Sequence, residues 1–324
     1  MTTLGRASKN GYLWIVRHAP DFEARSGASF GCRSTTDSRE KTCVRIFIIG
    51  ASGMAGHKLL EQLSVNHQVA GSVRSFSHPR LLSYLLYPGV DVLEPGSLLA
   101  PLSEFRPDVV VNAVGLVKQR EFRIADLVAT NAWFPHQLAS LCHLKGIRLL
   151  HLSTDCVYSG RRGMYSESDR PDADEPYGMS KVLGEPEETG LTIRTSLLGR
   201  ELRGKLSLIE WLYAQSGRRV KGFRKAFFSG VTTLELARII DLLVSDFPDL
   251  TGTWHVASER IDKDSLLRKV AQEARLDIEI QPDDSFQCDR SLDGSRFEAL
   301  TGYSPPDWDS AIRELVEDGR SYEP

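Results

Sequence analysis

The sequence predicts an α/β protein that combines a doubly wound parallel sheet with a smaller C-terminal lobe. Between residues 44 and 200, short apolar runs alternate with amphipathic segments, which is the pattern of strands connected by helices. The first apolar run ends in three glycines with the spacing G-x-x-G-x-x-G, as expected where a parallel strand turns into a helix. A later apolar run ends in Ser-Thr-Asp, which predicts polar side chains at the carboxyl edge of the sheet.

The composition is that of an ordinary globular protein. The 324 residues include 41% hydrophobic and 26% charged residues, and the formal net charge is −3. This charge gives no electrostatic reason to expect a nucleic-acid partner, and no apolar run approaches the ~20 residues of a membrane span. Five scattered cysteines favour reduced thiols and a cytoplasmic location over disulfides or a metal site. They are Cys32, Cys43, Cys142, Cys156 and Cys288.

Residues 1–43 are expected to form a poorly ordered N-terminal extension, because they show little apolar periodicity. One fragment, Tyr12–Pro20, resembles the opening strand of histidine phosphatases, in which a histidine after an arginine accepts phosphate. His18 stands at that position. A phosphatase needs a whole domain to position its other groups, so we favour a chance match. We expect that removing residues 1–42 leaves activity intact.

The first strand is expected at Val44–Ile49, a short apolar run of the kind buried in a parallel sheet. In the turn that follows, Gly50 permits the tight bend, Gly53 lets the backbone approach a pyrophosphate, and Gly56 lets the next helix pack on the strand. The positive end of that helix would face the phosphates. The alternative is an ordinary strand–helix turn, which seldom needs three such glycines. The sequence therefore predicts a dinucleotide cradle, formed by Gly50, Ser52, Gly53, Met54 and Gly56.

The second strand is expected at Gln68–Val73, and its end bears on the choice of dinucleotide. Sites that prefer NAD usually place an acid here to hold the ribose 2′-hydroxyl. No Asp or Glu lies between Glu61 and Asp91, and Arg74 stands at the strand end instead. A guanidinium suits a 2′-phosphate, so the sequence favours NADPH over NADH. The alternative is a solvated arginine at a strand end.

Three further strands and a long helix complete the expected cofactor half. A helix is predicted over Ala125–Lys145, broken or kinked near Pro135 and stopped by Gly146. The strands are predicted at Gly89–Val92, Pro107–Gly115 and Ile147–Leu152. The residues expected to contact the cofactor from these strands are Asp91, Val92, Asn112, Ala113 and Val114.

The predicted reaction site joins the end of the fifth strand to the start of the next helix. Tyr177 and Lys181, four residues apart, lie on one face of a helix that Pro176 can start. A nearby ammonium lowers the pKa of a phenol, so Tyr177 is expected to donate a proton to a carbonyl oxygen. Thr154 would hold the same oxygen by a hydrogen bond, and Lys181 would also hold the nicotinamide ribose. The alternative is a surface YxxxK pair, which is very common in helices.

The C-terminal part, residues 201–324, is expected to bind the substrate, with some segments returning to the sheet. Helices are predicted at Lys205–Ala214 and from Thr232 onward, and a strand at Gly252–Ala257. The basic residues within 218–225 are expected on a loop or edge strand, either as a rim for a diphosphate or as a solvated face. The polar segment that carries Arg290 would close on the substrate.

Together these motifs resemble the extended short-chain dehydrogenase/reductase superfamily, and within it the dTDP-4-dehydrorhamnose reductase branch. The resemblance covers roughly Val44 to the C-terminus, and its most specific block runs from Ser153 to Lys181. The matching segments are Gly50–Gly56, Asn112–Gly115, Asn131, Ser153–Gly160, Tyr165–Asp169, Tyr177–Lys181, Gly184–Glu185, Ile193–Ser196, Arg290–Phe297 and Thr301–Trp308.

This resemblance implies a Rossmann fold, NADPH as cofactor, and reduction of the 4-keto group of a nucleotide-linked 4-keto-6-deoxy sugar. Such a reaction belongs to the synthesis of cell-surface polysaccharides or natural products. A homodimer is left open. The implied catalytic residues are Thr154, Tyr177 and Lys181. The residues expected to contact the substrate are Lys118, Thr154, Asp155 and Arg290.

Two departures from the branch put the particular sugar in doubt. Leu197 stands where the rhamnose-forming enzymes usually place a tryptophan, and an aliphatic side chain cannot stack on a ring in the same way. Cys156 replaces the aromatic residue that usually follows Thr-Asp. No carboxylate cluster suggests the interface metal of some relatives, so no metal is predicted.

Two other functions stay open. A sugar-nucleotide dehydratase or epimerase would use the same triad, but a dehydratase usually carries Asp-Glu directly after the threonine. Cys156 is a poor substitute for that carboxylic acid. A non-catalytic, NADP-binding regulatory subunit is the second alternative, although a pure binder has no need to keep Tyr177.

Overall fold

The computed structural model describes residues 43–75, 78–118, 122–186 and 190–322, which lie within the unit Lys41–Pro324. The expectations for residues 1–42, including the extension and His18, lie outside the described residues.

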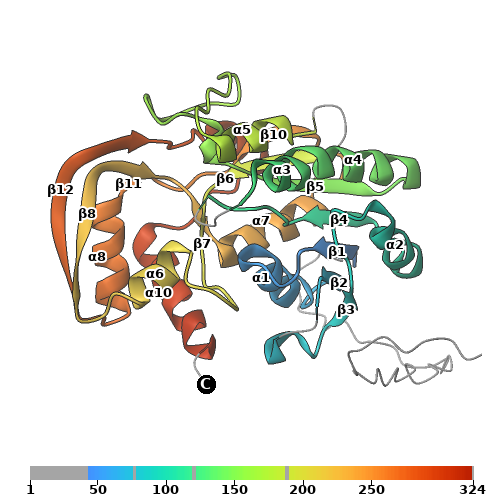
Figure 1. Cartoon of the computed structure of the whole chain (residues 1–324), viewed down its shortest axis with the longest axis horizontal. Coiled ribbons are helices and arrows are strands. Elements are labelled where there is room, and N and C mark those ends of the chain that lie inside the picture. The colour runs from blue at the N-terminus through green and yellow to red at the C-terminus, as the bar shows by residue number, and fades with distance from the viewer. Residues whose placement is uncertain (1–42, 76–77, 119–121, 187–189, 323–324) are drawn as a thin grey trace, which may run out of the picture. The chain divides into compact units, whose positions relative to one another are not determined.

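A seven-stranded parallel sheet organises this unit (Figure 1), as the alternation of strands and helices predicts. Its strand order is β10-β6-β5-β4-β1-β2-β3, and every neighbouring pair is parallel. The order reverses between β1 and β4, and doubly wound sheets bind ligands at that point. The strands are β1 Arg45–Ile49, β2 Gln68–Val73, β3 Leu85–Pro88, β4 Val109–Asn112, β5 Arg148–Thr154, β6 Leu191–Thr195 and β10 Gly252–His255.

Side chains of the sheet alternate between two cores on its opposite faces. In β1, Ile46 and Ile48 belong to one core, while Phe47 and Ile49 belong to the other. Helices α1 and α7 cover the first core, and α2 and α4 cover the second, so both faces of the sheet are buried (Figure 1). These helices are α1 Met54–Leu63, α2 Leu99–Phe105, α4 Phe134–Lys145 and α7 Thr233–Ser245.

The predicted second strand matches β2 residue for residue, but the prediction of a third strand at Gly89–Val92 is wrong. The apolar run Leu85–Tyr87 pairs with β2 instead. Gly89 has a φ of +77°, a conformation that ends the strand, and Asp91 follows in a turn.

The helix predicted at Ala125–Lys145, broken or kinked near Pro135, is interrupted by a wider turn that ends two residues before Pro135. Helix α3 Ile124–Leu127 passes through a π-helical turn, Val128–Trp133, into α4. Pro135 comes just after this turn and has no N–H, so it cannot donate to a carbonyl of the π-helical turn, and the wider turn accommodates this loss. The helix ends as predicted at Gly146, which has a φ of +65°.

The C-terminal lobe contains a three-stranded sheet, β11-β8-β12, packed against α6, α8 and α10. The basic residues 218–225 lie on β8, which pairs with β12 along this stretch, whereas the short strand β11 pairs only with Phe227 and Phe228. The stretch is therefore a strand with one open edge, in agreement with the edge-strand alternative of the prediction and not with a loop. Three of these cations form ion pairs with acids of β12: Arg219 with Glu279, Lys221 with Asp283, and Arg224 with Asp284. These pairs favour the solvated-face interpretation over a diphosphate rim. The elements are α6 Leu208–Tyr213, β8 Arg218–Phe228, β11 Ile261–Asp262, α8 Lys263–Glu273, β12 Ile278–Asp289 and α10 Trp308–Gly319.

Segments beyond residue 200 also return to the main sheet. Strand β10 forms its outer edge beside β6, and α7 begins after Thr232, whose side chain accepts a hydrogen bond from the Glu235 amide. Strands β7 Leu197–Leu198 and β9 Val231–Thr232 pair with each other, and α9 Ser295–Thr301 packs beside β10. Among the described residues, no helix combines the length and apolar character needed to cross a membrane.

Candidate active site

The turn between β1 and α1 has the geometry of a phosphate cradle. Gly50 has a φ of +85°, and a Cβ on Gly56 would lie 2.1 Å from the Gly50 carbonyl oxygen, so neither position tolerates a side chain. A Cβ on Gly50 would also lie 2.7 Å from Val114 Cγ2, which places the turn against the end of β4. Gly53 caps α1 without a side-chain hydrogen bond, so the first amides of the helix are available to an anion. The residues present therefore fit a dinucleotide.

The end of β2 lies beside this turn. The Ser72 carbonyl accepts a hydrogen bond from the Ala51 amide at 3.0 Å, and the Ser72 hydroxyl lies 3.4 Å from the Gly50 nitrogen. Arg74, two residues further on, is exposed. The Arg74 carbonyl accepts a hydrogen bond from the Gly89 amide at 3.3 Å. This bond holds the ends of β2 and β3 side by side, so the segment with Asp91, which comes directly after β3, lies at the same edge of the sheet as Arg74. Val92 packs against the core behind it.

Two buried asparagines shape the loop after β4. The Asn112 side chain accepts from the Val114 amide at 3.1 Å, and its Nδ2 lies 3.1 Å from His151 Nδ1. Asn131, in the π-helical turn, accepts from the Leu116 amide at 2.8 Å and donates to the Leu116 carbonyl at 2.9 Å. These bonds hold the loop Ala113–Leu116 against the carboxyl edge of the sheet.

Thr154 and Tyr177 meet at the end of β5. The next helix, α5 Pro176–Leu183, starts at the predicted proline and brings Tyr177 close enough to Thr154 for the threonine to act on the pKa of the phenol. The Thr154 hydroxyl also donates to Asp155 Oδ1 at 3.1 Å and accepts from the Cys156 amide at 3.2 Å. These are the two groups that the sequence predicts at one substrate oxygen.

The prediction that the neighbouring lysine lowers the pKa of Tyr177 is wrong for the chain by itself. Tyr177 is half-buried as a residue, but its hydroxyl is buried, and this burial raises the pKa of Tyr177. Cys156 and Asp155 raise this pKa further, whereas the interaction with Thr154 lowers it. The charge of Lys181 does not cancel the effect of burial on the pKa of Tyr177. The Lys181 amine donates to the Leu152 carbonyl at 2.9 Å, and burial lowers its pKa to about 8. The chain alone therefore keeps Tyr177 protonated.

Two cations contact the thiol of Cys156, and a third is near enough for their charges to interact. Lys118 Nζ lies 3.9 Å and Arg290 Nη1 lies 3.7 Å from Cys156 Sγ, and Arg290 Nε donates to the Tyr158 carbonyl at 2.8 Å. Burial raises the pKa of Cys156 to about 12, so this sulfur is a neutral thiol. The structure thus brings together the residues Lys118, Asp155 and Arg290, which the sequence predicts at the substrate.

The third cation, Lys263, is a residue that the sequence analysis misses. It opens α8 in the C-terminal lobe, and its amine lies 4.1 Å from the centroid of the Phe228 ring. Burial lowers the pKa of Lys263 to about 8, and the charges of Asp155 and Lys118 act on it in opposite directions. The sequence carries no sign of this position, because the lysine follows an ordinary helix cap.

A buried network supports the site from behind. Glu185 and Arg194 form an ion pair with a separation of 2.6 Å, in which each side chain is 8% exposed. Arg194 also donates to the Tyr158 hydroxyl at 2.8 Å, and the Tyr158 ring stacks on Tyr165 with centroids 4.2 Å apart. This network joins β6 and α5 to the loop that follows Thr154. Leu197, the departure noted in the sequence, packs against the main core.

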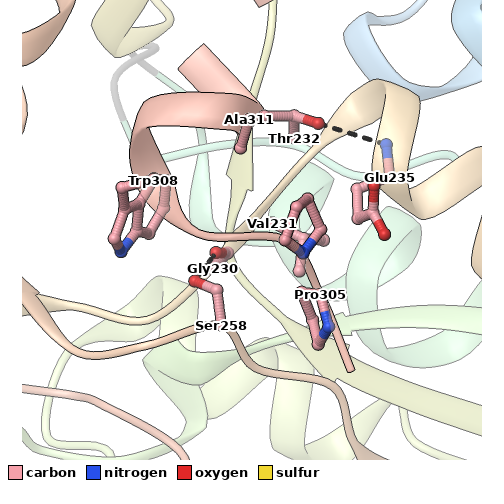
Figure 2. A pocket seen from close by; sticks show the side chains of 9 residues that line it. Gly230, Val231, Thr232, Glu235, Ser258, Pro305, Trp308 and Ala311 are labelled. Atoms are coloured by element: carbon pink, nitrogen blue, oxygen red, sulfur yellow. Dashed lines mark hydrogen bonds between the residues drawn. The ribbon is translucent and has the colours of Figure 1, made fainter. Parts of the chain in front are cut away.

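Two cavities in the described residues lie away from Thr154 and Tyr177. The smaller, of about 10 Å³, separates the start of α7 from α10, beside the hydrogen bond between Thr232 and the Glu235 amide (Figure 2). The larger, of about 540 Å³, lies between the loops around Ser258 and Asp293. The candidate site is therefore defined by its hydrogen bonds rather than by either cavity. No cluster of potential metal ligands occurs in the described part of the chain.

Comparison with known proteins places the chain in a family. The model of the RmlD substrate binding domain matches residues 44–321. The chain belongs to this family. A relative from Streptomyces griseus, named dTDP-4-dehydrorhamnose reductase, is 31% identical over 163 residues, which cover 48% of this chain and 50% of the relative. The chain spans about half the length of the first curated relatives it matches.

Solved structures agree with this assignment. A crystal structure described as a hypothetical dTDP-4-dehydrorhamnose reductase from Sulfolobus tokodaii is 28% identical, with a TM-score of 0.70, and the match covers 82% of this chain and 98% of that one. A second, from Bacillus anthracis and in complex with NADP, is 21% identical with a TM-score of 0.69, and the match covers 85% of this chain and 99% of that one. The predicted resemblance to RmlD-like extended short-chain dehydrogenase/reductases, with their Rossmann fold, is confirmed.

Proposed function

We propose that this chain is an oxidoreductase that uses NADPH to reduce the 4-keto group of a nucleotide-linked 4-keto-6-deoxy sugar. The observation that carries the proposal is the approach of the Thr154 and Tyr177 side chains to each other at the carboxyl edge of the sheet. A hydroxyl pair of this kind can hold one carbonyl oxygen and protonate it. The relatives named as dTDP-sugar reductases support the same class of reaction.

In this proposal the bound cofactor supplies hydride to the carbonyl carbon and, once oxidised, a positive charge near the phenol. Thr154 donates a hydrogen bond to the carbonyl oxygen and orients it. Tyr177 then gives its proton to the same oxygen, which completes the hydroxyl group. Lys181, one helical turn from Tyr177, is held by the Leu152 carbonyl and supplies a cation with a pKa of about 8. The high pKa of Tyr177 keeps the proton in place until the oxygen becomes basic.

We propose NADPH rather than NADH because Arg74 stands at the end of β2, beside the glycine turn. An exposed guanidinium at this position is accessible to a ribose 2′-phosphate, and it offers a bidentate donor pair. The amides at the start of α1 would hold the diphosphate of the cofactor.

The proposed substrate is anionic, and the cations around Cys156 support this part of the proposal. Lys118 and Arg290 come from different parts of the chain and both contact the Cys156 thiol, and the charge of Lys263 is influenced by Asp155 and Lys118. The diphosphate of a nucleotide-linked sugar would carry negative charge that can pair with these cationic side chains.

The experiment that tests the function is a substrate panel. Purified protein is mixed with NADPH and with dTDP- or UDP-linked 4-keto-6-deoxy sugars, and the loss of NADPH absorbance is followed. We expect oxidation of NADPH with at least one of these sugars and none with the corresponding 4-hydroxy sugars. Protein that binds NADPH but reduces no sugar would contradict catalysis and favour a binding subunit.

A further inference from the structure

The end of the described chain lies against the cofactor helix. Residues Arg320–Tyr322 form a last helical turn after α10, and the Tyr322 hydroxyl makes a hydrogen bond with Nε2 of His57 in α1. The two rings meet edge to face, with centroids 5.6 Å apart. Nothing in the proposed chemistry uses Tyr322.

The proton of His57 can be placed from its partners. His57 Nδ1 lies 2.8 Å from the Gly53 carbonyl oxygen, which can only accept a hydrogen bond. Burial lowers the pKa of His57 to about 4, so the ring is neutral near pH 7 and carries one proton. That proton must be on Nδ1, and Nε2 must accept from the Tyr322 hydroxyl. The hydrogen bonds therefore run in one direction, from Tyr322 through His57 to Gly53.

This chain of hydrogen bonds ends on the phosphate cradle. The Gly53 carbonyl also accepts from the His57 amide at 3.1 Å, and the Gly53 amide donates to the Gly50 carbonyl at 3.0 Å. The same planar peptide that contains the Gly53 carbonyl contains the Met54 amide, one of the free donors at the start of α1. Fixing the carbonyl on one side therefore fixes the direction of the amide on the other.

Cations from three segments hold the Tyr322 ring. The Arg80 guanidinium lies 4.1 Å, Lys58 Nζ 5.2 Å and the Arg200 guanidinium 5.3 Å from its centroid. Lys58 is fully buried and donates to Asp318 at 2.8 Å, just before the last turn. Arg80 donates to the carbonyl of Ser321 at 3.0 Å. The ring is thus held from several sides, with its hydroxyl directed at His57.

We infer that Tyr322 is a positioning residue for cofactor binding, which acts through His57 on the Gly53–Met54 peptide. The inference rests on the proposed binding of NADPH at the glycine turn. It makes the C-terminal turn part of the structure that binds the dinucleotide, although Tyr322 meets α1 at His57 and Lys58 rather than at the glycine turn itself.

The test is the dissociation constant of NADPH, measured by fluorescence titration without any sugar. Tyr322→Phe keeps the ring and its cations but removes the hydroxyl. Loss of that hydrogen bond is expected to weaken NADPH binding roughly fivefold. Once NADPH is saturating, kcat should stay within about twofold, because Tyr177 and Thr154 are untouched.

Ser321→Ala is the matched control for docking of the turn, since it removes a hydroxyl that accepts from Arg80 at 2.9 Å and donates to the Asp318 carbonyl at 2.6 Å but makes no contact with His57, while the bond from Arg80 to the Ser321 carbonyl stays. Its Kd for NADPH should equal that of the wild type. An unchanged Kd in Tyr322→Phe would overturn the inference, and so would an equal loss in both variants, which would mean that only docking of the turn matters. A wild-type chain that binds neither NADPH nor NADH would overturn the cofactor proposal itself, and that result precedes any variant.

A double-mutant cycle tests whether the two residues act in series. In a His57→Asn background, Tyr322→Phe should change the Kd for NADPH by less than about twofold, because the path to Gly53 is already broken. Fully additive losses would overturn the inference. If His57→Asn does not fold, the comparison of Tyr322→Phe with Ser321→Ala still shows whether the Tyr322 hydroxyl affects the Kd for NADPH.

Discussion

Burial decides the protonation of the reactive side chains at the end of β5. It raises the pKa of Tyr177 and of the Cys156 thiol and lowers the pKa of Lys181 to about 8, so each group is pushed toward its neutral form. A lysine four residues along a helix does not by itself make a phenol acidic. In the proposed reaction, Tyr177 is a proton donor whose acidity has to come from the charge that develops during reduction.

Tyr177→Phe should lower kcat by roughly 100-fold or more, since it removes the general acid and leaves the binding groups in place. NADPH absorbance with the best sugar of the panel measures the rate, and fluorescence titration shows that cofactor affinity is retained. Tyr84→Phe, at a tyrosine packed beside α1, is the control and should keep full activity. Full activity in Tyr177→Phe would refute its role as the donor.

Arg74→Ala should weaken NADPH about tenfold while leaving NADH unaffected, because only NADPH carries the phosphate that the guanidinium would contact. The ratio of kcat/KM for the two cofactors measures this effect. Arg313→Ala, at an exposed position of α10, controls for the loss of one surface charge. A parallel loss with both cofactors would show that Arg74 does not read the 2′-phosphate.

At the scale of elements, the glycine turn joins β1, α1 and the loop after β4 with almost no free space. A Cβ at Gly56 would strike the Gly50 carbonyl at 2.1 Å, and one at Gly50 would strike Val114 at 2.7 Å. The π-helical turn has a similar role on the next loop, where Asn131 pairs with both backbone groups of Leu116. Backbone packing therefore sets the width of the cradle.

Gly56→Ala should push α1 away from β1, with a loss of stability of about 1–3 kcal/mol and a weaker affinity for NADPH. Urea denaturation and fluorescence titration measure the two effects. Gly96→Ala is the matched control, since a Cβ there meets no atom within 4 Å. Equal behaviour of the two variants would contradict close packing at Gly56.

At the scale of the whole described unit, some C-terminal segments complete the cofactor half, while others form the C-terminal lobe with its own sheet and core. Strand β10 borders the main sheet, α7 covers one of its faces, and the last turn places Tyr322 on His57. The buried neutral state of His57 depends on this packing. It also gives the stability of the molecule a dependence on pH.

The pKa of His57 is about 4 in the folded chain, lowered by burial from 6.5. Between these values the unfolded chain binds a proton that the folded chain does not, so the stability rises with pH and falls on acidification. The full difference is about 3 kcal/mol. The free energy of unfolding should therefore fall less steeply from pH 7 to pH 4 in His57→Gln than in the wild type. His143→Gln, at an exposed position of α4, should behave as the wild type. Identical slopes for wild type and His57→Gln would refute a buried neutral His57.

Local patterns were sufficient for the elements that depend on neighbours in the chain. The glycine turn, β2, the helix end at Gly146 and the start of α5 follow from spacing and from the conformations that glycine and proline favour. The order Ser-Thr-Asp, then YxxxK, indicated which side chains would meet, because parallel strands end at one edge of a sheet.

Tertiary packing alone decided the rest. The position of β3, the burial that raises the pKa of Tyr177, the pairing of the basic strand β8 with β12, and the approach of Lys263 all involve residues far apart in the sequence. Hydrophobic spacing predicts which residues are buried but not which segments bury them, and a pKa depends on those neighbours. For this reason the sequence by itself determined the family and indicated the candidate reacting residues, whereas the structure determined the environment that sets their pKa values and the contact between the C-terminal turn and α1.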